Sequence, residues 1–190
     1  EQAFEPLKTS QEFRDIFVMV GDHPLLGVLI GAVLTMIVQS SSATIGITIA
    51  LAGAGLITFE ASVALVLGEN IGTTITANLA AIGTNLAAKR TAFAHFLFNF
   101  IGVAYMVLLL PVFLKFVNGI TPGDADFVIQ TQQQMQSLGG AIGDKPFIAR
   151  HIANAHSLFN IVNTIIFLPL IGVLAKLTTI IIRGRDEEME

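Results

Sequence analysis

The sequence predicts an all-α integral membrane protein, and three observations support this class. Hydrophobic residues make up 53% of the 190 residues and charged residues only 13%, with a mean hydropathy of +0.74. These values are outside the usual range of a soluble domain of this size. No Lys or Arg occurs between Arg14 and Lys89. The apolar stretches also have helical lengths, so we expect a re-entrant helical hairpin, a broken transmembrane helix and two further spans.

Composition also excludes several function classes. The net charge of -4 is largely set by the acidic tail at 186–190, and no basic patch is present, so nucleic-acid binding is not expected. The absence of cysteine excludes disulfides, cysteine-liganded metals and thiol nucleophiles. No cofactor is expected. Without an initiator Met or a signal-peptide pattern, the chain is expected to begin within a longer protein.

The N-terminal half is expected to contain a surface segment and a hairpin. Residues 1–23 carry an i, i+3, i+4, i+7 apolar stripe, which indicates either an amphipathic surface helix or an ordinary linker helix. In the next segment, 24–57, two short apolar runs flank a polar Gln-Ser-Ser-Ser tip at 39–42. At about 1.5 Å per residue the first run is too short to cross a hydrocarbon core of about 30 Å. We therefore expect a re-entrant hairpin, with a single kinked helix as the alternative.

The rest of the chain supplies the spans. Segment 58–117 is expected to hold a span broken at 68–74, where glycines favour unwinding, and a following transmembrane helix kinked at Pro111. Residues 118–146 are polar and rich in Gly and Gln, which predicts an extracytoplasmic loop. Segment 147–190 is predicted to be the last transmembrane helix with a charged cytoplasmic tail. Lys89, Arg90, Arg183 and Arg185 should mark the cytoplasmic face of a multi-pass protein of the cell membrane.

The polar tip has the chemistry of an anion site. Ser40, Ser41 and Ser42 lie where the second half-helix begins, so their hydroxyls and the free backbone N–H groups meet the positive end of the helix dipole. Gln39 can orient an anion with its amide and reach a cation with its carbonyl. The alternative is packing of small residues between helices.

A dianion at this position needs a mobile cation, because no Lys or Arg is nearby. Hard oxygen ligands suited to Na⁺ are available in the second polar cluster, from Asn70, Thr73, Thr74 and Thr76. Glu69 is a candidate for ion coupling; the alternative is a helix-end carboxylate that is hydrated or protonated.

One short repeat occurs in the last two spans. His95 to Asn99 and His156 to Asn160 share the pattern His-x-Leu-Phe-Asn, which places His and Asn four residues apart on one helical face. Interhelical hydrogen bonding is one interpretation and a functional role is the other.

The tip at 39–42 and the segment Gly68-Glu69-Asn70-Ile71-Gly72-Thr73-Thr74-Ile75-Thr76 together resemble the paired signatures of the type II sodium-phosphate cotransporter family, bacterial branch. The resemblance implies one half of an inverted-repeat transporter, matching the second repeat, and a function in sodium-coupled symport of inorganic phosphate. It implies two sets of binding residues. Phosphate would be held by Gln39, Ser40, Ser41 and Ser42. Na⁺ would be held by Gln39, Ser40, Ser42, Asn70, Thr73, Thr74 and Thr76. Glu69 departs from the animal members, which carry a small or neutral residue there.

The resemblance also implies partners: the first repeat of the same transporter or a second copy, and a C-terminal cytoplasmic regulatory domain. The sequence also leaves two other functions open. One is a phosphate-sensing membrane anchor without transport. The other is an intramembrane serine protease with His95, His151 or His156 as base, which the absence of a Gly-x-Ser setting disfavours. We therefore expect that the protein is not an enzyme.

Overall fold

The computed structural model describes residues 23–184, and every regular element in this range is helical, which confirms the all-α class. The surface segment expected at 1–23 lies outside the described residues except for His23. In chain order the helices are α3 (Pro24–Val38), α4 (Ser41–Gly53), α5 (Phe59–Ala80), α6 (Leu86–Leu108), α7 (Leu110–Ile120), α8 (Gln132–Leu138), α9 (Ile148–Phe167), the 3₁₀ turn η2 (Leu168–Leu170) and α10 (Ile171–Ile181).

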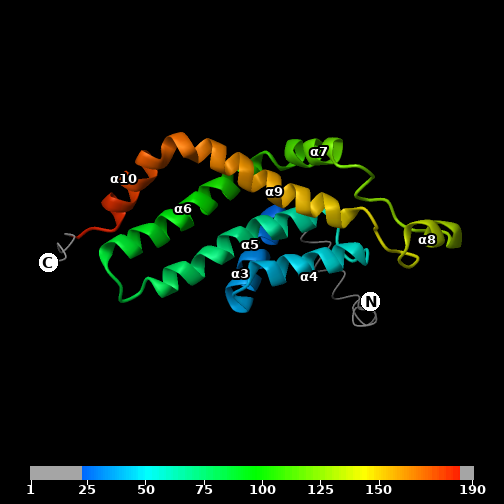
Figure 1. Ribbon diagram of the computed structural model, residues 1–190, viewed down its shortest axis with the longest axis horizontal. Helices are drawn as coiled ribbons and strands as arrows, with labels where there is room; N and C mark the ends of the chain where they lie inside the picture. The colour runs from blue at the N-terminus through cyan, green and yellow to red at the C-terminus, as the bar shows by residue number, and fades with distance from the viewer. Residues whose placement is uncertain (1–22, 185–190) are drawn as a thin grey trace.

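Helix α5 is the centre of the bundle. It packs against α3, α4, α6 and α9, and Figure 1 shows it between α4 and α6. Its first half is almost entirely buried, and most of the apolar core is built around it. Thr58 caps the helix by accepting a hydrogen bond from the backbone N–H of Ala61, as expected of a Thr at an N-cap. Helices α3, α4, α6 and α9 are therefore positioned by contact with α5.

Helices α3 and α4 form a hairpin. Gln39 ends α3 in the left-handed conformation (φ 56°), and Ser40 caps α4 with its side chain. Thr35 and Thr44 lie nine residues apart, yet their hydroxyl oxygens are 3.0 Å apart. In one continuous helix that separation would be about 13 Å, so the alternative of a single kinked helix is wrong.

The break expected at 68–74 is wrong, because α5 is one uninterrupted helix through these residues. Gly68 and Gly72 serve a different purpose. A Cβ on Gly68 would lie 1.9 Å from the carbonyl oxygen of Val28, and one on Gly72 would lie 2.5 Å from that of Ala32. The glycines therefore allow α3 to approach the backbone of α5, as small residues do where membrane helices cross.

The later spans are interrupted where proline occurs. Helix α6 ends at Leu108, and Pro111 lies in the first turn of α7, where its missing N–H does no harm. The last span bends at η2, which contains Pro169, before continuing as α10 (Figure 1). The loop expected at 118–146 contains the short helix α8, which begins at Thr131 with a capping box.

The apolar surface of the later helices is typical of a membrane protein. Two helical segments among residues 23–184, Leu86–Leu108 and Ile148–Ile181, are long and apolar enough to cross a membrane. Within an 18-residue apolar stretch of each segment, only 28% of the first and 11% of the second is buried in the structure. The core helix of a soluble protein would bury most of such a surface, whereas these helices leave it for lipid or another protein.

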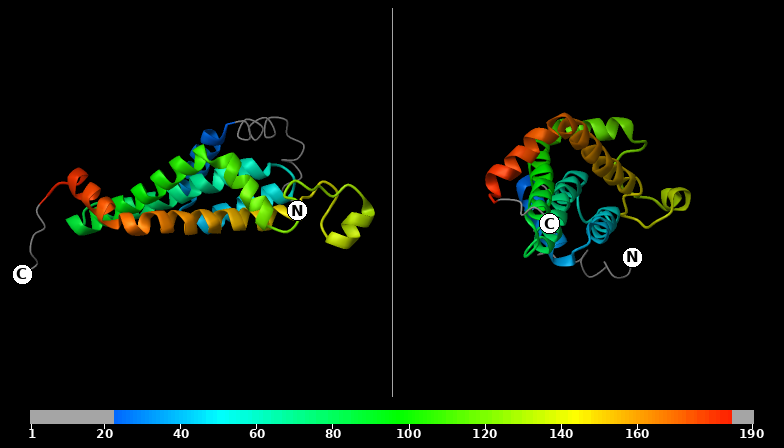
Figure 2. Two further views of the ribbon diagram at one scale, coloured as in Figure 1. Left: turned by 90° about the horizontal axis from the view of Figure 1, so that it is seen from above. Right: turned by 60° about the vertical axis from the view of Figure 1, so that its left-hand side comes forward.

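Lys89 and Arg90, at the start of α6, lie close to Arg183, after the end of α10, as predicted. Arg90 donates hydrogen bonds to the backbone oxygens of Ile182 (3.3 Å) and Gly184 (3.4 Å), so the start of α6 meets the end of α10. Figure 2 shows α10 and α8 at opposite ends of an elongated bundle. Arg185 lies outside the described residues.

Candidate functional site

The polar tip of the hairpin is an exposed turn. Gln39, Ser40 and Ser42 are exposed and Ser41 is half-buried. The Ser40 hydroxyl accepts a hydrogen bond from the backbone N–H of Ala43 (3.3 Å), which uses one donor of the first turn of α4. The N–H groups of Ser41 and Ser42 have no partner within the helix, as is general for a first turn. The tip thus presents hydroxyls, an amide and backbone donors at the positive end of a helix dipole.

The threonines of α5 lie on an intact helix. Each hydroxyl donates to a carbonyl one turn earlier: Thr73 to Glu69 (2.8 Å), Thr74 to Ile71 (2.7 Å) and Thr76 to Thr73 (2.7 Å). Carbonyls freed by unwinding are therefore not available here, but a donating hydroxyl keeps oxygen lone pairs that a cation can use. Thr73 and Thr76 are half-buried and Thr74 is buried, so the first two are more accessible.

The packing of α3 on α5 brings the two polar clusters to the same level. Val28 lies against Gly68 and Ala32 against Gly72, so the two helices run parallel. Thr35 also lies against Gly72, and one further turn along each helix leads from Thr35 to Gln39 of the tip and from Gly72 to Thr76. Among residues 23–184, no hydrogen bond joins the tip side chains to Thr73, Thr74 or Thr76.

Asn70 faces a different neighbour from the threonines. Its side-chain N–H donates to the backbone oxygen of Val66 (2.8 Å), and its Oδ1 accepts from Asn160 of α9 (3.5 Å). Asn160 also donates to the backbone oxygen of His156, and Asn99 does the same with His95. These contacts favour the packing interpretation of the His-x-Leu-Phe-Asn segments.

A row of buried hydroxyls beneath the tip was not predicted. Thr44 and Thr48 face the core from α4, and Thr48 donates to Oε1 of Glu69 at 2.7 Å. The side chain of Glu69 is fully buried. The sequence does contain a signal for this face, since Ser40, Thr44 and Thr48 follow i, i+4 spacing, but the spacing does not say what the face contacts.

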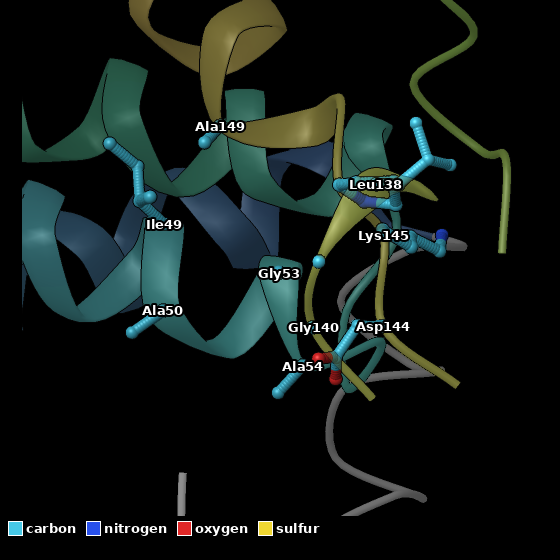
Figure 3. A pocket seen from close by; sticks show the side chains of 11 residues that line it. Ile49, Ala50, Gly53, Ala54, Leu138, Gly140, Asp144, Lys145 and Ala149 are labelled. Atoms are coloured by element: carbon cyan, nitrogen blue, oxygen red, sulfur yellow. The ribbon is translucent and has the colours of Figure 1, made fainter. Parts of the chain in front are cut away.

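The cavity in Figure 3 lies away from these residues. It has a volume of about 430 Å³ and is lined by the end of α4, the loop after α8 and the start of α9, including Ile49, Gly53 and Asp144. Lys145 closes the base of the hairpin there by donating its backbone N–H to Gly53 and its Nζ to Asp126. None of the predicted phosphate or Na⁺ ligands lines it, so the cavity is not the predicted binding site.

Known proteins resemble this chain, two of them over nearly its whole length. It is 34% identical to the Bacillus subtilis protein named "Uncharacterized protein YqeW" over 180 residues, which cover 95% of this chain and 51% of that protein. It is 26% identical to the Escherichia coli K12 protein named "Putative inorganic phosphate export protein YjbB", covering 98% of this chain and 30% of that protein. The human "Sodium-dependent phosphate transport protein 2B" is 46% identical over 96 residues, which cover 47% of this chain and 14% of the human protein.

The chain therefore spans about half or less of the length of these relatives. No solved structure matches it. The family model described as Na+/Pi-cotransporter matches residues 3–119, which is more than half of the chain. The chain belongs to the Na⁺/Pi-cotransporter family, a family of transporters and not of enzymes.

Proposed function

We propose that this chain forms one half of a multi-pass transporter that carries inorganic phosphate together with Na⁺ across the cell membrane. The observation that carries the proposal is the exposed Gln-Ser-Ser-Ser turn at the start of α4, on a hairpin packed closely against α5. The printed names of the E. coli and human relatives, which refer to phosphate, support it. Because the family is one of transporters, the serine-protease alternative is wrong.

Phosphate is held at the tip by Gln39, Ser40, Ser41 and Ser42. The hydroxyls and the first backbone N–H groups of α4 donate to its oxygens, and the helix dipole favours its negative charge. The two tip helices have 15 and 13 residues, which makes each about 20 Å long, so a re-entrant hairpin would hold the turn inside the bilayer.

Sodium provides the compensating charge. No Lys or Arg occurs from residue 15 to residue 88, which includes the hairpin and all of α5. A phosphate dianion within the membrane therefore needs cations that bind with it. The proposed Na⁺ ligands are oxygens of Gln39, Ser40 and Ser42 from the tip and of Asn70, Thr73, Thr74 and Thr76 from α5.

The partner that completes the site is an inverted repeat, preferably the first repeat of the same transporter. It covers the exposed side of the tip and provides the second half of an alternating-access pair. A second copy of this chain would serve only if it were inserted in the opposite orientation. A cytoplasmic regulatory domain following α10 is also proposed.

Vesicle uptake by the whole two-repeat transporter tests the function. We expect labelled phosphate to accumulate when an inward Na⁺ gradient is imposed and to stop when K⁺ replaces Na⁺, with no proton gradient in either case. Equal uptake in Na⁺ and K⁺ would contradict sodium coupling. Phosphate binding without any flux would favour the sensing anchor instead.

A further inference from the structure

We propose that α7 is an interfacial helix, which lies along the headgroup boundary of the bilayer at the end of α6 opposite Lys89 and Arg90. It buries in lipid an outer apolar stripe that consists of Val112, Phe116 and Ile120. The partner of this surface is the bilayer itself. The proposal rests on the membrane location of the chain and not on phosphate transport, so it is tested independently of the proposed function.

Helix α7 presents three different faces. The residues buried against the bundle are Leu110, Phe113 and Val117. The apolar stripe follows i, i+4 spacing beside this buried face, and its side chains are 53% to 70% exposed. The exposed residues on the remaining side are Pro111, Lys115, Asn118 and Gly119. The outward surface is therefore apolar on one side and mainly polar on the other, as in helices that lie in a membrane interface.

The length of α6 places α7 at the end of the hydrocarbon core. At about 1.5 Å per residue, α6 extends about 27 Å from Arg90 to Leu108, which is close to a core thickness of about 30 Å. Leu109 then interrupts the helix (φ -96°, ψ 4°), and Pro111 has no N–H with which to continue the hydrogen bonds of α6. Helix α7 therefore begins where the core ends.

Two hydrogen bonds to α9 show that α7 inclines across the bundle. Tyr105 of α6 donates to Asn163 (3.2 Å), and Asn154 donates to Thr121 at the end of α7 (2.9 Å). The helical chain from Tyr105 to Thr121 is about 24 Å long, whereas α9 advances only about 14 Å from Asn163 to Asn154. A helix that ran alongside α9 would cover equal lengths. Helix α7 thus crosses α9 obliquely, at the margin of the bundle (Figures 1 and 2).

The surface of α9 changes from polar to apolar at the level of α7. The first exposed large apolar side chain of α9 is Ile161 (56%), and Ile165 and Ile166 follow it. The polar residues that precede Ile161 in α9 are Arg150, His151, Asn154, His156, Ser157 and Asn160. Because Asn154 contacts the end of α7, this end lies beside the polar part of α9, about 10 Å along the helix from Ile161. Helix α7 therefore lies at the boundary between the two parts.

Lipid is the occupant that fits the apolar stripe. Val112 continues the outward apolar surface of α6, since Leu108 is 82% and Leu109 is 52% exposed directly before it. Lys115, on the polar side, can hold its ammonium group among lipid phosphates or in water while its apolar stem stays lower. The polar segment 121–146 follows at once, so the chain leaves the membrane after α7.

Tryptophan fluorescence tests the depth of α7, because the chain has no Trp of its own. Each variant of the 190-residue chain carries one Trp and is placed in lipid nanodiscs, which leave both faces of the bilayer open to water. Some of the lipids are brominated, either near the headgroup or near the end of the acyl chain. We expect Phe116→Trp to be quenched severalfold more by the shallow bromines than by the deep ones. Phe100→Trp, in the middle of α6 and 50% exposed, should show the reverse order.

Lys115→Trp is the matched control, one residue away on the polar side of α7. Compared with Phe116→Trp, it should be quenched more by iodide in the water and less by the shallow bromines. If Phe116→Trp does not fold, Val112→Trp on the same stripe provides the measurement.

Three results would overturn the proposal. Deep quenching of Phe116→Trp, like that of Phe100→Trp, would make α7 part of a span. Iodide quenching as strong as that of Lys115→Trp would place the stripe in water. Protection from every quencher would mean that protein, and not lipid, covers it.

Discussion

Gln39 adopts a backbone conformation that side chains other than glycine seldom adopt. Its φ of 56° makes it the one non-glycine residue with positive φ among residues 23–184. The left-handed region costs an ordinary residue roughly 1–2 kcal/mol. A glycine would make this turn without that cost, so the presence of glutamine is consistent with a use for its amide in ligand binding.

Gln39→Gly keeps the left-handed turn and removes the side-chain amide, so it tests the two contributions of residue 39 separately. We expect equal or higher thermal stability, because glycine accepts this conformation freely, and weaker phosphate binding, because one ligand is lost. Calorimetric titration of the purified protein with phosphate, alongside a thermal melt, measures both. Unchanged affinity would remove Gln39 from the proposed site.

Ser41 and Ser42 should contribute to binding but not to folding. Neither hydroxyl makes a hydrogen bond within residues 23–184, so replacing either with Ala leaves no buried group unpaired. Each variant should lose a contact to a charged ligand worth about 1.5–3 kcal/mol, or about 10- to 150-fold in affinity. Ser137→Ala on the exposed helix α8 is the control, and an equal effect there would refute the assignment.

Thr73 and Thr76 should set the Na⁺ requirement. Replacing either with Ala removes an oxygen ligand and one local hydrogen bond to a helix carbonyl, while Ala itself favours the helix. We expect the Na⁺ concentration for half-maximal phosphate uptake to rise severalfold. The control is Thr84→Ala, in the exposed turn before α6, which should leave this Na⁺ concentration unchanged. If Thr73→Ala also left it unchanged, the Na⁺ site would lie elsewhere.

At the scale of elements, the contact between α3 and α5 determines where the tip lies. Three glycines make this contact: Gly31 against Leu65, Gly68 against Val28 and Gly72 against Ala32. Membrane helices pack mainly by close van der Waals contact, because lipid is as apolar as their side chains. Any added carbon at these positions therefore separates the hairpin from α5.

Gly68→Ala is expected to destabilise the bundle. Its Cβ would lie 1.9 Å from the backbone oxygen of Val28, which can move only if the helix moves, at a cost of about 1–3 kcal/mol. Gly46→Ala on α4 is the matched control, since nothing lies within 4 Å of its Cβ and alanine favours a helix interior. The melting temperature should fall for the first variant and hold or rise for the second. Equal changes would mean that the α3–α5 contact contributes no specific stability.

At the scale of the whole molecule, a large apolar surface is left uncovered. Side chains such as Ile37 (75% exposed), Leu108 (82%) and Val112 (70%) face outward, and the polar tip lies next to Ile37. Lipid can cover the apolar side chains. Moving a polar group from water into hydrocarbon without a hydrogen-bond partner, however, costs about 4–8 kcal/mol. The exposed tip therefore favours a protein partner on that side.

The isolated chain should accordingly fail to transport as a monomer. One hairpin provides one half of an alternating-access site, and its counterpart must come from an inverted repeat. The measurement combines the mass of the purified chain in lipid with phosphate flux after reconstitution. A strict monomer that moves phosphate against its gradient would refute the two-repeat proposal.

Local chemistry was sufficient for several correct predictions. The all-helical class follows from hydropathy, and the hairpin follows from two short apolar runs around a polar turn. The meeting of Arg90 with the end of α10 follows from the number of spans between the basic residues. Each of these depends on composition and order along the chain, which a sequence contains in full.

The tertiary structure decided the roles of residues that depend on a neighbour. In the sequence, Gly68 and Gly72 predicted a break in α5, yet the helix is continuous through both. Their lack of a side chain instead allows α3 to approach α5 closely. Thr48 and Glu69 are 21 residues apart and no local pattern pairs them, but folding joins them at 2.7 Å. Helical spacing states which residues share a face, and only the packing of one helix on another determines what that face contacts.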